Sequence, residues 1–282
     1  MTIMNQLFNV ITTIGVALLI VPTVCLANGK ILATPGVSQV EGSGGGGLVP
    51  WAQLAGYATE DEIAISAFCT RATVQDFQLD TCGAQVNFYD RLELSYAEQN
   101  FDVEPLSTTL SQEIFGAKVR LYGDLVYSAW PQLSLGIQYK ALDSDDIAFA
   151  LGAHDNKGVD IYLAASKLHL GALAGYNLLW NATLRYTEAN EMGLLGFGGP
   201  NGNGGIQGEV SAAVLLNKHL AVGVEYRQKP DNLGLNESRW RDVFVAWFPN
   251  KHVSVTMAYV DLDTIAALPN QDGWYVSLTG YY

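Results

Sequence analysis

The last eleven residues, Asp272-Gly-Trp-Tyr-Val-Ser-Leu-Thr-Gly-Tyr-Tyr282, decide the fold class of this chain. Every second residue from Trp274 to Tyr282 is apolar or glycine, so these residues share one face of an extended strand. About ten residues with this period of two are typical of a transmembrane β-strand, in which lipid-facing and lumen-facing side chains alternate. The stretch predicts a barrel strand rather than a helix.

The same alternation recurs upstream in segments of about ten residues separated by turn residues. A soluble β-sandwich also alternates, but it would expose a densely charged outer face. Here the second face is rich in Gly, Ala, Ser, Asn and Gln, and only 15% of all residues are charged. Aromatic residues also gather at segment ends, as in a membrane-interface girdle. The clearest segments are Leu92–Tyr96, Phe115–Tyr122, Leu133–Lys140, Ile206–Val214 and Leu220–Arg227.

Short and long connections alternate along the chain, as they do when tight periplasmic turns face one end of a barrel and extracellular loops face the other. The predicted fold is therefore all-β: a transmembrane antiparallel up-and-down β-barrel of about 14 strands, from Lys30–Gly42 to Asp272–Tyr282. An even number of strands places both termini in the periplasm. The alternative is 12 strands preceded by an N-terminal segment, because the glycine run Gly44–Gly47 and the stretch Trp51–Tyr57 show no clear inward face.

The beginning of the chain predicts export. Ile11–Pro22 is an apolar run of signal-peptide length, and Cys25 and Ala27 are small residues before a cleavage point. The run is short for a spanning helix. We expect a cleaved signal peptide at residues 1–27 and a barrel at residues 28–282, located in the outer membrane of a Gram-negative bacterium.

Two cysteines remain after this cleavage, Cys69 and Cys82. In the predicted register both lie on the lipid-facing side of neighbouring strands, a few residues from one loop. A hairpin disulfide is therefore possible in the oxidising periplasm, and two unbonded lipid-facing side chains are the alternative.

The sequence shows no constellation that carries chemistry. None of the four histidines lies near a nucleophile, and no Cys and His residues have zinc-ligand spacing. We expect no catalytic residue, no enzyme activity, no metal and no cofactor. A net charge of −13 argues against a nucleic-acid partner.

The inward faces carry charges that the alternation groups into two sectors. The predicted basic sector comes from three consecutive strands, and the predicted acidic sector from three others, so they would face one another across the lumen. They would set the selectivity of a channel, or form salt bridges in a filled barrel. The basic residues are Arg91, Lys118, Arg120 and Lys140, and the acidic residues are Glu209, Glu225 and Asp242.

One predicted loop is too apolar for free solvation. Met192–Gly199 reads Met-Gly-Leu-Leu-Gly-Phe-Gly-Gly. We expect this loop either to fold inward as a constriction or to pack over the barrel mouth.

Several strings are specific in combination, among them Gly36–Gly42, Tyr89–Tyr96, Gly193–Gly199 and Pro249–Ser254. Together they resemble a proteobacterial family of uncharacterised proteins, the domain of unknown function number 3034, from about Lys30 to the end. The resemblance implies an exported outer-membrane protein and transfers no catalytic residue. The terminal strand also resembles the strand that the barrel-assembly machinery recognises, so we expect that machinery as a partner through Tyr282.

The leading functional hypothesis is a porin-like channel or facilitator for small solutes. Two alternatives remain: a non-conducting barrel that acts as a membrane anchor or scaffold, and an uptake route for apolar molecules. Outer-membrane lipid and lipopolysaccharide are expected to surround the barrel. The sequence does not name the solute.

Overall fold

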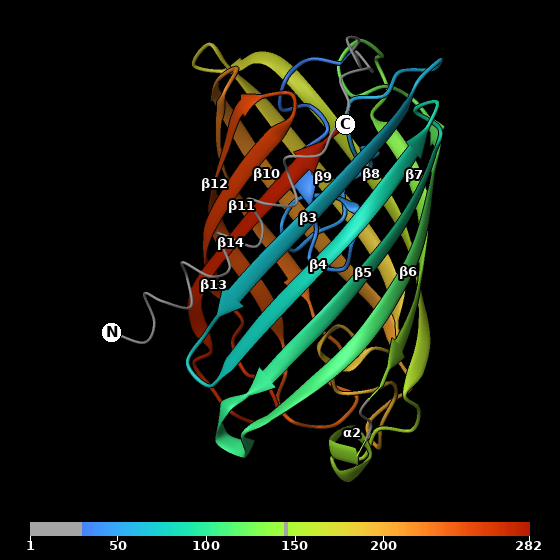
Figure 1. Ribbon diagram of the computed structural model, residues 1–282, viewed down its shortest axis with the longest axis vertical. Coiled ribbons are helices and arrows are strands. Elements are labelled where there is room, and N and C mark those ends of the chain that lie inside the picture. The colour runs from blue at the N-terminus through green and yellow to red at the C-terminus, as the bar shows by residue number, and fades with distance from the viewer. Residues whose placement is uncertain (1–29, 144–145) are drawn as a thin grey trace.

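The computed structural model describes residues 30–143 and 146–282, and within them twelve antiparallel strands close into a single up-and-down barrel (Figure 1). The predicted signal peptide, residues 1–27, lies outside the described residues. The barrel strands are β3 (Ile63–Thr73), β4 (Phe77–Phe88), β5 (Leu92–Val103), β6 (Thr108–Tyr122), β7 (Gln132–Leu142), β8 (Lys157–Leu173), β9 (Tyr176–Thr187), β10 (Gly205–Asn217), β11 (Leu220–Gln228), β12 (Arg239–Asn250), β13 (Val253–Asp261) and β14 (Asp272–Tyr281).

The barrel closes where its last strand meets its first. β14 pairs antiparallel with β3 in a register that runs from Trp274 opposite Thr73 to Tyr281 opposite Ser66. The strand predicted from the terminal alternation is therefore the strand that removes the free edge of the sheet. Closure gives every strand a hydrogen-bonded neighbour on both sides. A sheet in a lipid bilayer requires this, because no water is present to satisfy the backbone groups of a free edge.

The two ends of the barrel differ. The end at the top of Figure 1 carries the C-terminus and the turns that follow β4, β6, β8, β10 and β12; we call it the turn end. The opposite end carries η1 (Glu104–Leu106), α2 (Asp146–Ala150), η2 (Asn190–Gly193) and the connections after β11 and β13; we call it the loop end.

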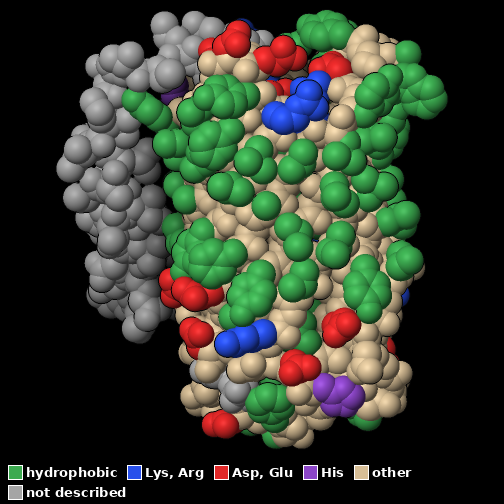
Figure 2. All heavy atoms as spheres, turned by 90° about the vertical axis from the view of Figure 1, so that its right-hand side faces the viewer, with side chains coloured by type: hydrophobic (Ala, Val, Ile, Leu, Met, Phe, Trp, Pro, Cys, Tyr) green, Lys and Arg blue, Asp and Glu red, His purple; other side chains and the backbone are tan. Residues whose placement is uncertain are grey.

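The outer surface carries an apolar band. In β11, Val224 points outward and is 49% exposed, whereas the neighbouring Glu225 is buried inside. Figure 2 shows hydrophobic side chains over the middle of one face and charged side chains toward its two ends. This distribution fits a lipid-facing wall between two polar margins. No helix among the described residues is long and apolar enough to cross a membrane.

The predicted count of 14 strands is wrong, and the alternative of 12 strands with an N-terminal segment is found. Residues 30–58, which we call the plug segment, are not part of the wall, and residues 33–58 are buried inside the barrel. Their strands are two short ones of two residues each, β1 (Val37–Ser38) and β2 (Gly44–Gly45), which pair antiparallel with one another. Glycines explain this course: Gly36 and Gly42 adopt positive φ, which reverses the chain where a wall strand would stay extended.

The apolar loop after β9 folds inward, the first of the two predicted arrangements. Residues 188–204, which we call the inward loop, carry η2, and Leu194, Leu195 and Phe197 in it are almost fully buried. The plug segment and the inward loop thus fill the barrel interior together. The lumen holds two inserted segments, and the candidate site lies where they meet the wall.

Candidate functional site: a plugged lumen

Glu41 is the centre of the contacts between the plug segment and the wall. Its buried carboxylate forms ion pairs with Lys140 of β7, with Arg185 of β9 (3.3 Å) and with Arg227 of β11 (2.6 Å). Burial alone would raise the pKa of the Glu41 carboxyl, but the three cations together hold that pKa well below its usual range. One plug residue therefore carries a full negative charge between three wall strands.

Two wall carboxylates complete this ion network. Asp160 lies 2.7 Å from Lys140 and 3.0 Å from Arg185, and Glu209 lies 2.6 Å from Arg185. With Glu41 they make three anions for the three cations. The balance matters because a buried charge left without a partner costs about 3–5 kcal/mol.

A second carboxylate holds the plug backbone from another part of the wall. Glu93 of β5 accepts hydrogen bonds from the amides of Gly44 (3.0 Å) and Ala55 (2.6 Å). Lys118 of β6 pairs with Glu93 at 3.3 Å and donates to the carbonyl oxygen of Gly44 at 2.7 Å. The wall thus binds a plug donor and a plug acceptor at the same glycine.

Glu225 and Asp242 form a third contact region. Glu225 accepts a hydrogen bond from the Leu48 amide (2.7 Å) and another from Ser211, which in turn accepts from the Trp51 indole (2.9 Å). Asp242 lies directly opposite Glu225 in the β11–β12 register. One oxygen of Asp242 has no hydrogen-bond partner among the described residues. The plug therefore meets Glu225, and a second buried acid lies beside Glu225 on the neighbouring strand.

The predicted charge sectors are only partly in the lumen. Lys118, Lys140 and the three predicted acids are buried in the interior, but each meets the plug segment or a wall partner rather than open solvent. The plug and the inward loop occupy the space between the sectors, so no field crosses an open channel in this state. Both sectors were predicted without the segment that separates them.

One of the basic assignments needs correction, and another basic residue lies near the end of the barrel. Arg91 is not a lumen residue: it lies in the β4–β5 turn, is exposed, and donates to the Arg120 carbonyl oxygen. Arg120 lies at the turn end, where it pairs with Asp90 and, at 3.4 Å, with Asp124. Arg91 directly precedes β5, and the alternation does not hold there because the turn at Asp90 interrupts the extended chain.

Sequence reasoning missed Glu41 and Arg185, the most highly connected members of the network. Arg185 occupies an inward position of β9 with Asn181 and Thr183, so strict alternation through this segment could have found it. Glu41 belongs to a segment with no period, and nothing local in the sequence marks its role.

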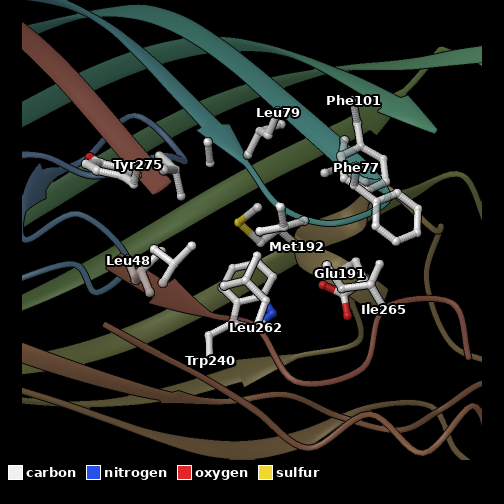
Figure 3. Close-up of a pocket in the computed structure, with 15 residues that line it drawn as sticks. Leu48, Phe77, Leu79, Phe101, Glu191, Met192, Trp240, Leu262, Ile265 and Tyr275 are labelled. Atoms are coloured by element: carbon white, nitrogen blue, oxygen red, sulfur yellow. The ribbon is translucent and has the colours of Figure 1, made fainter. Parts of the chain in front are cut away.

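A narrow apolar cavity separates the plug segment from the inward loop (Figure 3). The space inside it that a water-sized sphere can occupy is about 40 Å³. The plug contributes Val40 and Leu48, and the inward loop contributes Met192 and Leu194. The wall contributes Phe77, Leu79, Phe101, Trp240 and Tyr275, among others.

Close to this cavity, one lysine fastens the inward loop. Lys229 pairs with Glu191 of η2, lies 3.7 Å from Glu237, and donates to the Thr264 carbonyl oxygen at 2.6 Å. Burial and the neighbouring Glu191 carboxylate raise the pKa of Glu237 to about 10, so Glu237 is protonated at neutral pH. The loop end is thus held by a lysine shared between two acids.

Cys69 and Cys82 are bonded as a disulfide between β3 and β4. They are register partners on the outer face of the wall, with a Cα–Cα distance of 4.2 Å. The bond lies away from the plug and ties the first two strands of the barrel together. Among residues 30–143 and 146–282, no group of three or more His, Cys, Asp and Glu side chains is placed to hold a metal ion.

Comparisons with known proteins place the chain in a family and beside other barrels. The family described as "Protein of unknown function (DUF3034)" matches residues 34–279. Similar solved structures include the Acinetobacter baumannii outer membrane protein Omp33 (6% identity, 80% of this chain, 100% of that chain, TM-score 0.49). They also include the KdgM porin (10%, 77% and 98%, 0.49) and the COG4313 outer membrane channel from Pseudomonas putida F1 (12%, 78% and 94%, 0.44). No curated protein matches the chain.

Proposed function

Since the chain belongs to this family of unknown function, we propose its function from its own geometry: it is a gated passage for small solutes across the bacterial outer membrane. The closed barrel and its apolar outer band support the location, with lipid and lipopolysaccharide as the surroundings. The loop end then faces the outside and the turn end the periplasm. A cleaved signal peptide at residues 1–27 would deliver the chain.

The observation that carries this proposal is how the plug is fastened. Within the described part of the chain, the backbone–backbone hydrogen bonds of residues 30–58 stay inside the segment, and the hydrogen bonds between this segment and the wall involve side chains. The Glu41 network is the strongest of those contacts. A segment that precedes the first barrel strand and is held this way can leave the lumen without breaking a strand pair of the barrel.

The wall behind the plug supports an aqueous path. Its inward side chains are polar or charged at the level of the ion network, where a filled core would be apolar. Withdrawal of the plug would leave Lys118, Lys140, Arg185 and Arg227 beside the wall acids. Such a lining suits small polar or charged solutes and would set their selectivity.

The inward loop is a second closure at the other end. Its buried apolar residues and the Lys229 pairs keep it inside the barrel mouth. Passage therefore requires two movements, one at each end. A barrel closed at both ends would conduct no ions until one of these segments moves.

The test is single-channel conductance in planar bilayers with variants that loosen each closure. Glu41→Gln removes the plug charge, and Lys229→Gln removes the loop lysine. We expect the wild type to stay closed, each single variant to open rarely, and the double variant to conduct longest. The matched control is Glu98→Gln with Lys157→Gln, because both of these side chains are exposed.

The double variant decides between this function and the scaffold alternative. Folding is checked by heat-dependent migration on gels, which reports an intact barrel. A folded double variant that is as silent as the wild type overturns the gated passage and favours a non-conducting scaffold.

A further inference from the structure

The cavity between the plug and the inward loop contains an unused hydrogen-bond donor. The indole N–H of Trp240 has no acceptor among the described residues, although the side chain is only 3% exposed. A buried donor left without a partner has lost its hydration and gained no hydrogen bond in return. Trp240 lines the cavity, so a molecule held there can supply the missing acceptor (Figure 3).

The indole is held in place before any ligand arrives. The Arg227 guanidinium carbon lies 5.2 Å from the ring centroid, and the Lys229 ammonium lies 5.7 Å from it. These cations belong to the two networks that fasten the plug and the inward loop. The donor therefore points from a fixed ring, as binding sites with defined orientation require.

The other walls fix the chemical class of the ligand. Phe77, Leu79, Phe101 and Leu48 offer apolar surface, and the carboxylate of Glu191 is already paired with Lys229. A charged ligand would lose its hydration here and gain no free counter-charge. An uncharged molecule with an apolar body would keep its contacts and complete the Trp240 hydrogen bond.

We propose that this cavity binds a small uncharged molecule with an apolar, ring-sized body and one hydrogen-bond acceptor, which accepts from Trp240 Nε1. The cavity is narrow, and the flexible Met192 side chain is the wall that yields to a ring. Binding itself is independent of conductance; only the step after binding, release through the barrel, rests on the proposed function. The site lies between the two closures, where a bound molecule touches both.

Two probes of nearly equal shape test the acceptor. Acetophenone carries a carbonyl oxygen where α-methylstyrene carries a methylene group. Their affinities are measured by calorimetric titration of the folded, full-length protein in detergent, with empty micelles as the blank. The variant Trp240→Phe removes the donor, and Trp247→Phe on the same strand is the matched control because Trp247 points outward.

We expect the wild type and Trp247→Phe to bind acetophenone about threefold to tenfold more tightly than α-methylstyrene, the range of one neutral hydrogen bond. In Trp240→Phe the two affinities should become equal. A preference that survives in Trp240→Phe, or no binding of either probe to the wild type, overturns the proposal.

A second pair of variants tests the location. Leu79→Trp fills the cavity and should weaken both probes at least tenfold, whereas Leu94→Trp on the outer surface should weaken neither. If both variants bind equally, the probes bind elsewhere and the site is refuted. These titrations use the closed barrel, so a failure here leaves the conductance result standing, and a silent double variant with intact binding overturns only the gated passage.

Discussion

Single charged residues decide which parts of this interior can move. Glu41 is buried among three cations, and each of those cations also depends on a wall acid or on Glu41 itself. Forming a buried ion pair costs desolvation free energy, and removing one partner costs more because the other charge stays buried alone. The Glu41 network therefore favours one docked position of the plug over many loose ones.

The depressed pKa of Glu41 predicts how the plug responds to acid. A carboxyl whose folded pKa is below its unfolded value stabilises the docked state above the unfolded pKa, about 4.3, and loses that contribution as pH falls through the lower folded value. The plug should thus stay docked at pH 5 and loosen only well below pH 4. Hydrogen exchange of amides 36–49, corrected for intrinsic rates, measures this. Loss of protection already at pH 5–6 contradicts the assignment.

Glu237 predicts the opposite response at the loop end. Its folded pKa, about 10, lies above its unfolded value, so its contribution is complete below about pH 4.3 and is lost as pH rises toward 10. The slope is at most about 1.4 kcal/mol per pH unit. Glu237→Gln should still accept the hydrogen bond from the Ala266 backbone amide, and because it cannot ionise it should stabilise the inward loop at pH 9. Hydrogen exchange of residues 189–199 at pH 6 and pH 9 compares the two proteins, and equal protection at pH 9 argues against a protonated Glu237.

At the level of elements, what the sequence could predict follows from periodicity. Wall strands place alternate residues in lipid and lumen, so their period of two is visible in the sequence, as in Leu220–Arg227. The plug segment contacts the wall on all sides and has no period, and Lys30–Gly42 was therefore mistaken for a strand. Glu41 could not be recognised because its partners Lys140, Arg185 and Arg227 lie 99, 144 and 186 residues away, more than any local pattern spans.

The glycine run of the plug makes an element-scale prediction. A Cβ atom at Gly46 would lie 1.8 Å from Glu225 Oε1, the side chain that holds the Leu48 amide. Gly46→Ala should therefore displace this turn and reduce stability by about 1–3 kcal/mol. Gly205→Ala is the control, because its nearest neighbouring atom is 3.9 Å away. Urea unfolding and exchange of amides 44–49 report both effects, and an unchanged Gly46→Ala protein would show that the plug is not packed this closely.

At the scale of the whole molecule, the barrel wall and its contents are separate in hydrogen bonding and joined through side chains. Each barrel strand pairs with two neighbours, while β1 and β2 pair only with one another. The interior contents nevertheless bury much of the lumen surface. The same architecture is compatible with a removable stopper and with a permanent core, and these differ in whether the wall needs the plug to fold.

The chain of residues 59–282 separates a stopper from a core. Without the plug all twelve strand pairings remain available, and water can enter to hydrate the charges that Glu41 neutralised, so no charge has to stay buried alone. We expect this chain to fold into lipid vesicles with full heat-dependent migration and a lower urea midpoint than the full chain, since the plug contacts are lost. The full chain with Glu41→Gln should fall between the two. If residues 59–282 fail to fold where the full chain succeeds, the plug is part of the folding core, and a passage that opens by its withdrawal is excluded.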